Sequence, residues 1–290
     1  MSNILKEYFR TFFKIFTFFY KKCGFFVDFF KKERYNSSDM EKYVHKKNFE
    51  IKYCDTDFRD RLKLSAVLAY FEEVAGSSAD ELGFGYKDLK PKELTFMVSG
   101  VCCEFVKPIF QGEEVTVKTW PNPPSYAVFG REYQICRPDS DELLCSATSR
   151  WCVYSFKEEK ILSSKAIEGQ DYSSYNTDRA LDLSAWKIQA FTPEEGEYVY
   201  SMTVRNSEYD HNMHVNNTRY ADYCVNCFTI AELSNLTLKR FQISYAKQCR
   251  ENDVLSFYRK QTSENEYTVL GLNQNNEMVV ASKFTFELVK

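Results

Sequence analysis

The feature that most constrains the fold of this 290-residue chain is an order of segments that occurs twice. Each half begins with a strand-like segment, continues with a long helix that carries an apolar stripe, and ends with four segments rich in β-branched and aromatic residues. A helix that is buried on both flanks needs a sheet that curls around it. The order therefore predicts two similar units, each an antiparallel sheet around one helix.

In the first half, the helix is predicted over Leu64–Leu82, with Gly83 as its stop. In the second half, it is predicted over Asn217–Leu233. The first set of strands is predicted near residues 49–54, 95–106, 114–120, 127–137 and 143–156. The second set is predicted near residues 198–206, 240–247, 253–260, 266–272 and 278–289. Between the halves, we expect one short helix near residues 180–188.

The repeat is also visible residue by residue. The equivalent pairs are Asp57 and Asp210, Arg61 and His214, Ser65 and Thr218, and Tyr70 and Tyr223, followed by Phe105–Lys107 and Tyr245–Lys247. Similarity of this kind indicates two copies of one unit. We therefore predict an α+β fold, a tandem (double) hot-dog in which each half is an antiparallel sheet wrapped around a long central helix.

The chain is predicted to have four parts. Residues 1–39 are a basic amphipathic extension, residues 44–156 the first hot-dog domain, residues 157–197 a linker, and residues 198–290 the second hot-dog domain. The extension contains eight Lys or Arg against four Asp or Glu, whereas the rest contains 30 against 37. Because the body is mildly acidic, we expect no nucleic-acid partner.

Residues 1–35 have two competing interpretations. Their aromatic residues recur at helical spacing opposite a basic face, which is typical of a helix that contacts a membrane surface. Charges at Lys14, Lys21 and Asp28 interrupt any apolar run of the roughly 20 residues that a span needs. Alternatively, the segment is upstream sequence joined to a true start at Met40. We expect a cytoplasmic protein, membrane-peripheral under the first interpretation.

The segment Asp210–Tyr220, DHNMHVNNTRY, places two of the three histidines just before the second predicted helix. Asn216 or Asn217 can cap that helix, whose unpaired N–H groups would face the preceding residues. A polar run of this kind can also serve for capping alone. However, the first half has DFRDRL where the second has DHNMHV, and capping does not explain this difference. We therefore predict a catalytic site in the second half.

The ten cysteines do not indicate a disulfide framework, because no cleavable secretory signal is evident. We expect reduced intracellular thiols. Cys224 and Cys227 form a CxxC on the second predicted helix, where buried packing is a better interpretation than zinc binding, since no second pair of ligands lies nearby. We predict no metal and no cofactor.

Over about residues 44–290, the chain resembles the acyl-acyl carrier protein (ACP) thioesterases of plants and bacteria, which are tandem hot-dog proteins. The resemblance is most specific at Arg205 with DHNMHVNNTRY and at ISYAKQCRENDVL, Ile243–Leu255. Weaker similarity lies in YCDTDFRDRLKLSAVLAYFEEVAG and SRWCVYSF. The family's catalytic Asp, Asn and His correspond to Asp210, Asn212 and His214.

The second motif departs from the family pattern, which has a catalytic Glu followed by Cys. Here the two positions are Gln248 and Cys249. Because glutamine accepts no proton at neutral pH, two hypotheses stay open. Either Asp210 or His214 is the base and Gln248 only positions water, or the enzyme is slow or altered. Cys249 is a nucleophile in principle, but a packed or water-orienting thiol is the favoured interpretation.

The resemblance implies an acyl-ACP thioesterase that hydrolyses fatty acyl thioesters to free fatty acid and carrier-protein thiol, in fatty acid biosynthesis. Its implied partner is ACP bearing a fatty acyl chain, and a homodimer is a further hypothesis. The alternatives are a non-catalytic acyl-thioester-binding module, an acyl-CoA thioesterase and a dehydratase of acyl thioesters. Aromatic residues of the first half are candidates for a tunnel lining or for ordinary core: Phe71, Phe84, Phe96, Phe105 and Phe110.

Overall fold

The computed structural model of the chain describes residues 42–167, 171–183 and 185–289. The predictions made for residues 1–39, membrane contact included, lie outside these residues. Within the described ranges, no helix is long and apolar enough to cross a membrane.

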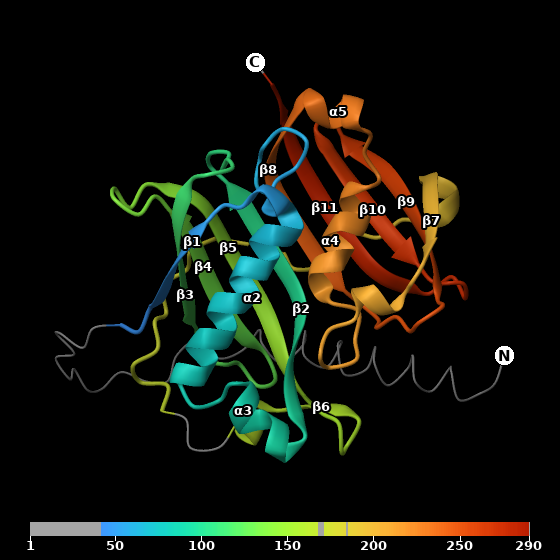
Figure 1. Ribbon diagram of the computed structural model, residues 1–290. Helices are drawn as coiled ribbons and strands as arrows, with labels where there is room; N and C mark the ends of the chain where they lie inside the picture. The colour runs from blue at the N-terminus through green and yellow to red at the C-terminus, as the bar shows by residue number, and fades with distance from the viewer. Residues whose placement is uncertain (1–41, 168–170, 184, 290) are drawn as a thin grey trace, which may run out of the picture. The chain divides into compact units, whose positions relative to one another are not determined.

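Both halves have the predicted order of one strand, one main helix and four long strands, and the first half adds a short strand at Lys160–Leu162 (Figure 1). The first half contains β1 (His45–Glu50), α2 (Leu64–Glu81), the short α3 (Tyr86–Leu89), β2 (Leu94–Phe105), β3 (Glu114–Pro121), β4 (Phe129–Cys136), β5 (Leu143–Ser155) and β6 (Lys160–Leu162). The second half contains β7 (Glu197–Thr203), α4 (Asn217–Val225), α5 (Ile230–Ser234), β8 (Leu236–Tyr245), β9 (Val254–Ser263), β10 (Glu266–Leu272) and β11 (Met278–Leu288).

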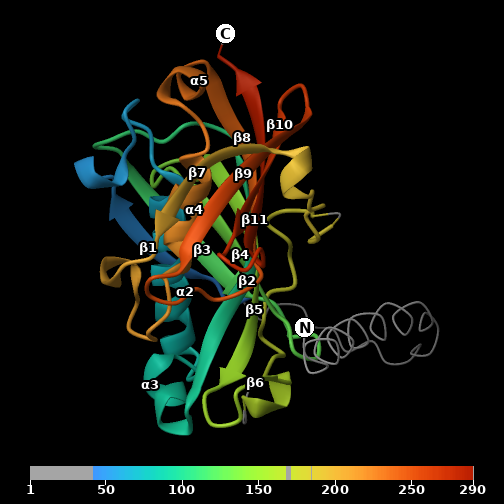
Figure 2. The ribbon, with the colours of Figure 1, turned by 90° about the vertical axis from the view of Figure 1, so that its right-hand side faces the viewer.

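The strands form one antiparallel sheet in the order β1-β3-β4-β5-β2-β8-β11-β10-β9-β7, and β6 pairs with β5. From the outer edge of the sheet to its centre, the first half runs β1-β3-β4-β5-β2 and the second half runs β7-β9-β10-β11-β8. Equivalent strands therefore follow the same order in both halves. Helices α2 and α4 lie on the same side of this sheet (Figure 2). The double hot-dog prediction is therefore confirmed.

The halves join through the pairing of β2 with β8. In this ladder Cys102 lies opposite Gln242. These two residues are also equivalent in the repeat, because each stands three positions before the matched pair Phe105 and Tyr245. A strand pair whose centre joins equivalent residues is a self-complementary, two-fold contact. The chain thus folds like a dimer whose two subunits are covalently linked.

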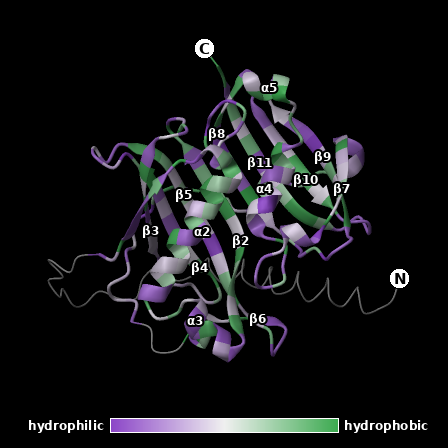
Figure 3. Ribbon diagram, viewed as in Figure 1, coloured by the Kyte–Doolittle hydropathy of each residue, from purple (hydrophilic) through white to green (hydrophobic). Residues whose placement is uncertain are grey.

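Helix α2 buries the predicted apolar stripe against the first half of the sheet. Val67, Leu68, Phe71 and Val74 are all almost fully buried, and apolar residues recur along α2 and along the strands behind it (Figure 3). Phe71 stacks on Tyr133 of β4, with ring centroids 4.4 Å apart. The helix ends as predicted before Gly83, which has φ = 76°, a conformation that glycine adopts without steric cost.

Three predicted elements differ from the structure. The first strand is His45–Glu50 and not 49–54, because Tyr53–Asp55 forms a 3₁₀ turn. The helix predicted over 217–233 divides into α4 and α5, since Thr229 starts a new helix by accepting the Glu232 N–H at 3.2 Å.

The third difference concerns residues 180–188, whose described residues form no helix. Their backbone groups bind the sheet instead of one another. Gln242 donates to the carbonyls of Ala185 and Trp186 at 3.2 and 2.9 Å, and the Trp186 ring lies 4.8 Å from the Arg150 guanidinium. These contacts stabilise an extended path.

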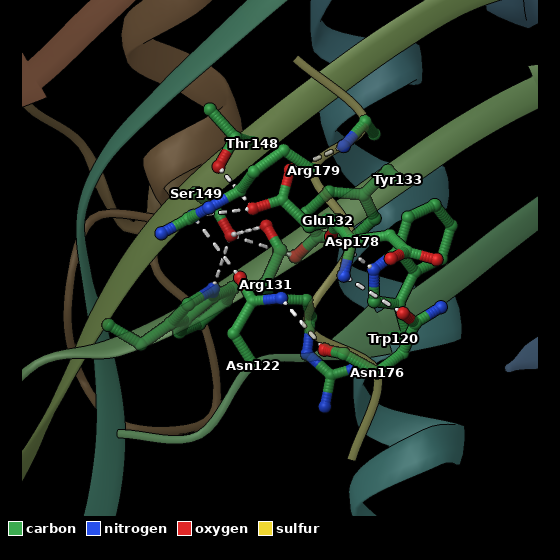
Figure 4. Close-up of polar contacts among 12 residues, drawn as sticks. Trp120, Asn122, Arg131, Glu132, Tyr133, Thr148, Ser149, Asn176, Asp178 and Arg179 are labelled. Atoms are coloured by element: carbon green, nitrogen blue, oxygen red, sulfur yellow. Dashed lines mark hydrogen bonds and ion pairs between the residues drawn. The ribbon is translucent and has the colours of Figure 1, made fainter. Parts of the chain in front are cut away.

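The segment between β6 and β7 crosses the face of the sheet opposite α2. Tyr133 contacts α2, so its neighbour Glu132 points to the other face. Glu132 is fully buried there and accepts hydrogen bonds from Thr148, Arg179 and the Ala180 N–H at 3.0, 2.8 and 3.1 Å (Figure 4). This segment is therefore bound along the sheet rather than free.

Candidate active site

A cavity of about 590 Å³ is lined by residues of both halves. Its volume lies within the roughly 300–1,000 Å³ of small-molecule sites. Its polar residues include Glu72, Asp210, Asn212, His214, Asn217 and Gln248. The cavity therefore gathers all but one of the five predicted site residues, the exception being Cys249, and adds a carboxyl group from the first half.

The three predicted catalytic side chains are placed by one tight turn before α4. Asp210 Oδ1 accepts the N–H groups of Asn212 and His214 at 2.8 and 3.2 Å. The Asp210 N–H in turn donates to the His214 carbonyl at 2.8 Å, and Met213 adopts φ = 60° to close the turn. Because backbone contacts fix Asp210, the turn holds the Asn212 and His214 side chains at the cavity wall.

The start of α4 is organised by Asn216, as predicted. Its side chain accepts the Thr218 N–H at 2.8 Å and the Thr218 hydroxyl at 2.6 Å. The N–H of Asn217 has no intrahelical carbonyl to bind, since it lies in the first turn. Asn217 lines the cavity, so a hydrogen-bond donor and the positive end of the helix dipole lie beside Asn212 and His214.

The environment of His214 favours its neutral form. Burial lowers the pKa of the imidazole, and the charge of Asp210 opposes this effect only in part. The ring centroid of Phe156, just after β5 of the first half, lies 6.3 Å from that of His214. At neutral pH, His214 can therefore accept a hydrogen bond from water.

Gln248 and Cys249 differ in placement although they are adjacent. Gln248 is exposed and lines the cavity. Cys249 is 1% exposed and is not among the lining residues. Burial raises the pKa of its thiol, with a smaller opposing effect from Tyr220. This environment suits a packed thiol better than a thiolate nucleophile.

Glu72 was not among the sequence-predicted site residues. It lies in α2, one turn from Leu68 and Ala75, which are buried. Burial and the charge of Asp210 raise its pKa to about 7, while a hydrogen bond with the Asn217 side chain opposes the shift. A glutamate within the apolar stripe of a core helix is the sequence signal that could have found it.

The remainder of the cavity is mainly apolar and extends into the first half. Its lining there includes Ala75, Ala79, Phe84, Leu89, Leu94, Phe96 and Phe129. Of the five predicted tunnel aromatics, Phe84 and Phe96 line it, whereas Phe71, Phe105 and Phe110 do not. The cavity thus joins a polar site to a space suited to a hydrocarbon chain.

The turn at Asp57–Arg61 in the first half has the same backbone hydrogen bonds as the turn at Asp210–His214, but its side chains make different contacts. Asp57 Oδ1 accepts the N–H groups of Arg59 and Arg61 at 2.8 and 3.2 Å. Asp57 also forms an ion pair with Arg59, which donates to the carbonyls of Leu233 and Leu236. This turn therefore connects the halves, whereas the side chains of the second turn line the cavity.

Metal-binding groups are not clustered within the described ranges, where no three His, Cys, Asp or Glu side chains are placed to hold an ion. Cys224 and Cys227 are both buried in the core, as the packing interpretation predicted. Burial raises the pKa of Cys224 to about 12.

The fold and the cavity together define a double hot-dog protein whose cavity joins polar side chains to an apolar pocket. The model of the acyl-ACP thioesterase N-terminal domain matches residues 42–165, and that of the C-terminal domain matches residues 192–287. The chain belongs to the acyl-ACP thioesterase family. It is a thioester hydrolase of fatty acid biosynthesis.

Several solved structures share the fold, among them two acyl-ACP thioesterases. An acyl-ACP thioesterase from Bacteroides thetaiotaomicron is 24% identical, with a TM-score of 0.76 over 84% of this chain and 98% of that one. A 12:0-ACP thioesterase from Umbellularia californica is 16% identical, with a TM-score of 0.78 over 87% of this chain and 100% of that one.

Proposed function

We propose that the cavity binds the thioester of a fatty acyl chain carried by ACP and that Asp210, Asn212 and His214 promote its hydrolysis. The observation that carries the proposal is the single turn that places these side chains where the polar and apolar parts of the cavity meet. The acyl chain occupies the apolar part, and the carrier-protein arm extends from the polar part.

Each side chain has a distinct role in the proposal. The Asn212 amide and the N–H of Asn217 hold the carbonyl oxygen as it becomes an oxyanion. His214, kept neutral by burial, accepts a hydrogen bond from the attacking water. Asp210 fixes both residues through Oδ1. Among the described residues, no hydrogen bond reaches Asp210 Oδ2, so this oxygen can orient the water or the imidazole.

The test is release of free thiol from acyl-ACP substrates of several chain lengths by the purified protein. We expect Asn212→Ala to lower kcat by about 10²–10³-fold and His214→Ala by about 10²-fold or more. The matched control is Arg61→Ala, the position equivalent to His214 in the first half, which should retain full activity. Binding without turnover by the unmodified protein would support an acyl-binding module and refute the proposal.

A further inference from the structure

The cavity contains a carboxyl group that the catalytic turn does not supply. Glu72 lies in α2 of the first half, yet it faces the same cavity as Asp210 and His214. Its neighbour Glu73 instead points to solvent, where it forms an ion pair with Lys47 at 2.7 Å. Two adjacent glutamates on one helix thus have different environments, and only Glu72 can reach a bound thioester.

The contacts of Glu72 come from the second half as well as the first. The Asn217 side chain at the start of α4 lowers its pKa and the charge of Asp210 raises it, so groups of the second half lie close enough to the Glu72 carboxyl group to affect its charge. Tyr133 of β4 and Tyr245 of β8 are the other titratable groups that sense it. Within the described ranges, no ion pair neutralises Glu72, so its charge is available for chemistry in the cavity.

The second half has glutamine where a carboxylate would be useful. Gln248 lines the same cavity and can only donate and accept hydrogen bonds. We propose that Glu72 is the general base of the reaction, so that one half supplies the base and the other supplies the Asp210, Asn212 and His214 turn. This inference rests on the thioesterase function proposed above.

The proposed step balances without any further reactant. The Glu72 carboxylate takes a proton from water as the water oxygen bonds to the thioester carbon, and the carbonyl electron pair moves to oxygen. The oxyanion then collapses and breaks the carbon–sulfur bond, and the thiolate that leaves receives the proton from Glu72. The products are a carboxylic acid and a thiol, and Glu72 is regenerated.

The protonation behaviour of Glu72 agrees with this role. Its pKa of about 7 leaves the carboxyl group about equally protonated and ionised at neutral pH, which is the range in which a general base is most effective. The pKa of His214 is lowered, and those of Tyr133 and Tyr245 are raised by burial. These shifts move the three groups away from pH 7, where kcat/KM should rise with pH as Glu72 ionises.

The test is Glu72→Gln, which keeps the size of the side chain and its capacity for hydrogen bonding but cannot accept a proton. We expect kcat to fall by about 10²-fold or more with little change in KM, and the rise of kcat/KM near pH 7 to disappear. Glu73→Gln is the matched control and should leave both unchanged. In the Glu72→Gln protein, adding Gln248→Glu should recover about tenfold of the lost rate.

Two results would overturn the assignment: a Glu72→Gln enzyme with kcat within about twofold of the original, or one whose slower reaction keeps the same rise near pH 7. Failure of the broader proposal has a different signature. In that case the unmodified protein releases no thiol, or Asn212→Ala and His214→Ala have no effect. An active enzyme that needs Asn212 and His214 but not Glu72 would refute the further inference alone.

Discussion

At the scale of single residues, the two copies of the turn show how one backbone can serve two purposes. Asp57 and Asp210 accept equivalent pairs of N–H groups, at the same two distances. The residue two positions later is Arg59 in one copy and Asn212 in the other. Arginine reaches across to neighbouring carbonyls, whereas asparagine stays at the cavity. The side chain, and not the fold of the turn, decides whether the turn connects the halves or lines the cavity.

We predict that Glu72→Gln stabilises the protein at alkaline pH. The folded-state pKa of Glu72 is raised to about 7 from an ordinary value near 4.5. The folded state therefore binds the proton more tightly than the unfolded state, and stability falls as pH rises between these two values. At pH 8 the glutamine variant should have a free energy of unfolding about 1–3 kcal/mol higher.

Urea unfolding at pH 8 and at pH 4 checks this prediction, because the difference should vanish below the unfolded-state pKa. Equal stabilities at pH 8 would show that burial of the Glu72 charge has no energetic cost.

The site residues could be predicted from the sequence only where they lie close together in it. Asp210, Asn212 and His214 stand within five positions, and asymmetry between the repeats marked them. Glu72 reaches the same cavity only through the packing of α2 beside α4. Nothing in the local pattern around residue 72 specifies which distant turn it faces, so only the tertiary structure places Glu72 in the cavity.

At the scale of elements, α2 contains a position suited to testing the pocket. Gly76 lines the cavity, and a Cβ added there would have no atom within 4 Å. A larger side chain can therefore enter the space beside Ala75 and Ala79 without displacing the helix or the sheet. The cavity, rather than the core, would lose volume.

We predict that Gly76→Leu shifts the preference of the enzyme toward shorter acyl chains. The measurement is kcat/KM for a series of acyl-ACP substrates. Gly76→Ala is the control, because it adds only one methyl group and should raise the free energy of unfolding by about 0.5–1 kcal/mol. An unchanged chain-length profile in Gly76→Leu would place the acyl chain elsewhere.

The first-half turn provides a second test at this scale. Arg59 links this turn to the end of α5 and the start of β8 through the carbonyls of Leu233 and Leu236. We expect Arg59→Ala to lower the free energy of unfolding by about 1.5–3 kcal/mol, the range for hydrogen bonds to a charged group.

Denaturant midpoints measure this effect, and Arg59→Lys, which keeps the charge but loses the two-carbonyl geometry, should recover part of it. If Arg59→Ala unfolds at the original midpoint, the contact between the halves is energetically unimportant.

At the scale of the whole molecule, the segment between β6 and β7 is held along the sheet by hydrogen bonds to β4. Arg179 and the Ala180 N–H satisfy the buried Glu132 carboxylate. We predict that Arg179→Ala destabilises the protein by about 1–3 kcal/mol, because it leaves a buried charge with one partner fewer. Limited proteolysis should then cut residues 171–183 faster. An unchanged cleavage rate would show that contacts other than Arg179–Glu132 hold this segment on the sheet.

Much of the fold could be predicted because hydrophobic periodicity is local. Helix α2 and the eight long strands β2–β5 and β8–β11 lie close to where their patterns indicated, whereas the short β6 was not predicted. The break between α4 and α5 was missed because the apolar spacing continues across it, while the Thr229 cap depends on one hydrogen bond. The extended path of residues 180–188 was missed because its partners, such as Gln242, lie in another part of the chain.

The cavity that draws on both copies has a consequence for assembly. The residue equivalent to Glu72 in the second half is Val225, and the residue equivalent to His214 in the first half is Arg61. Under the proposed mechanism, a symmetric pair made from either half alone would therefore lack either Glu72 or His214. Covalent fusion guarantees that every molecule contains one of each kind, in equal numbers and always facing each other.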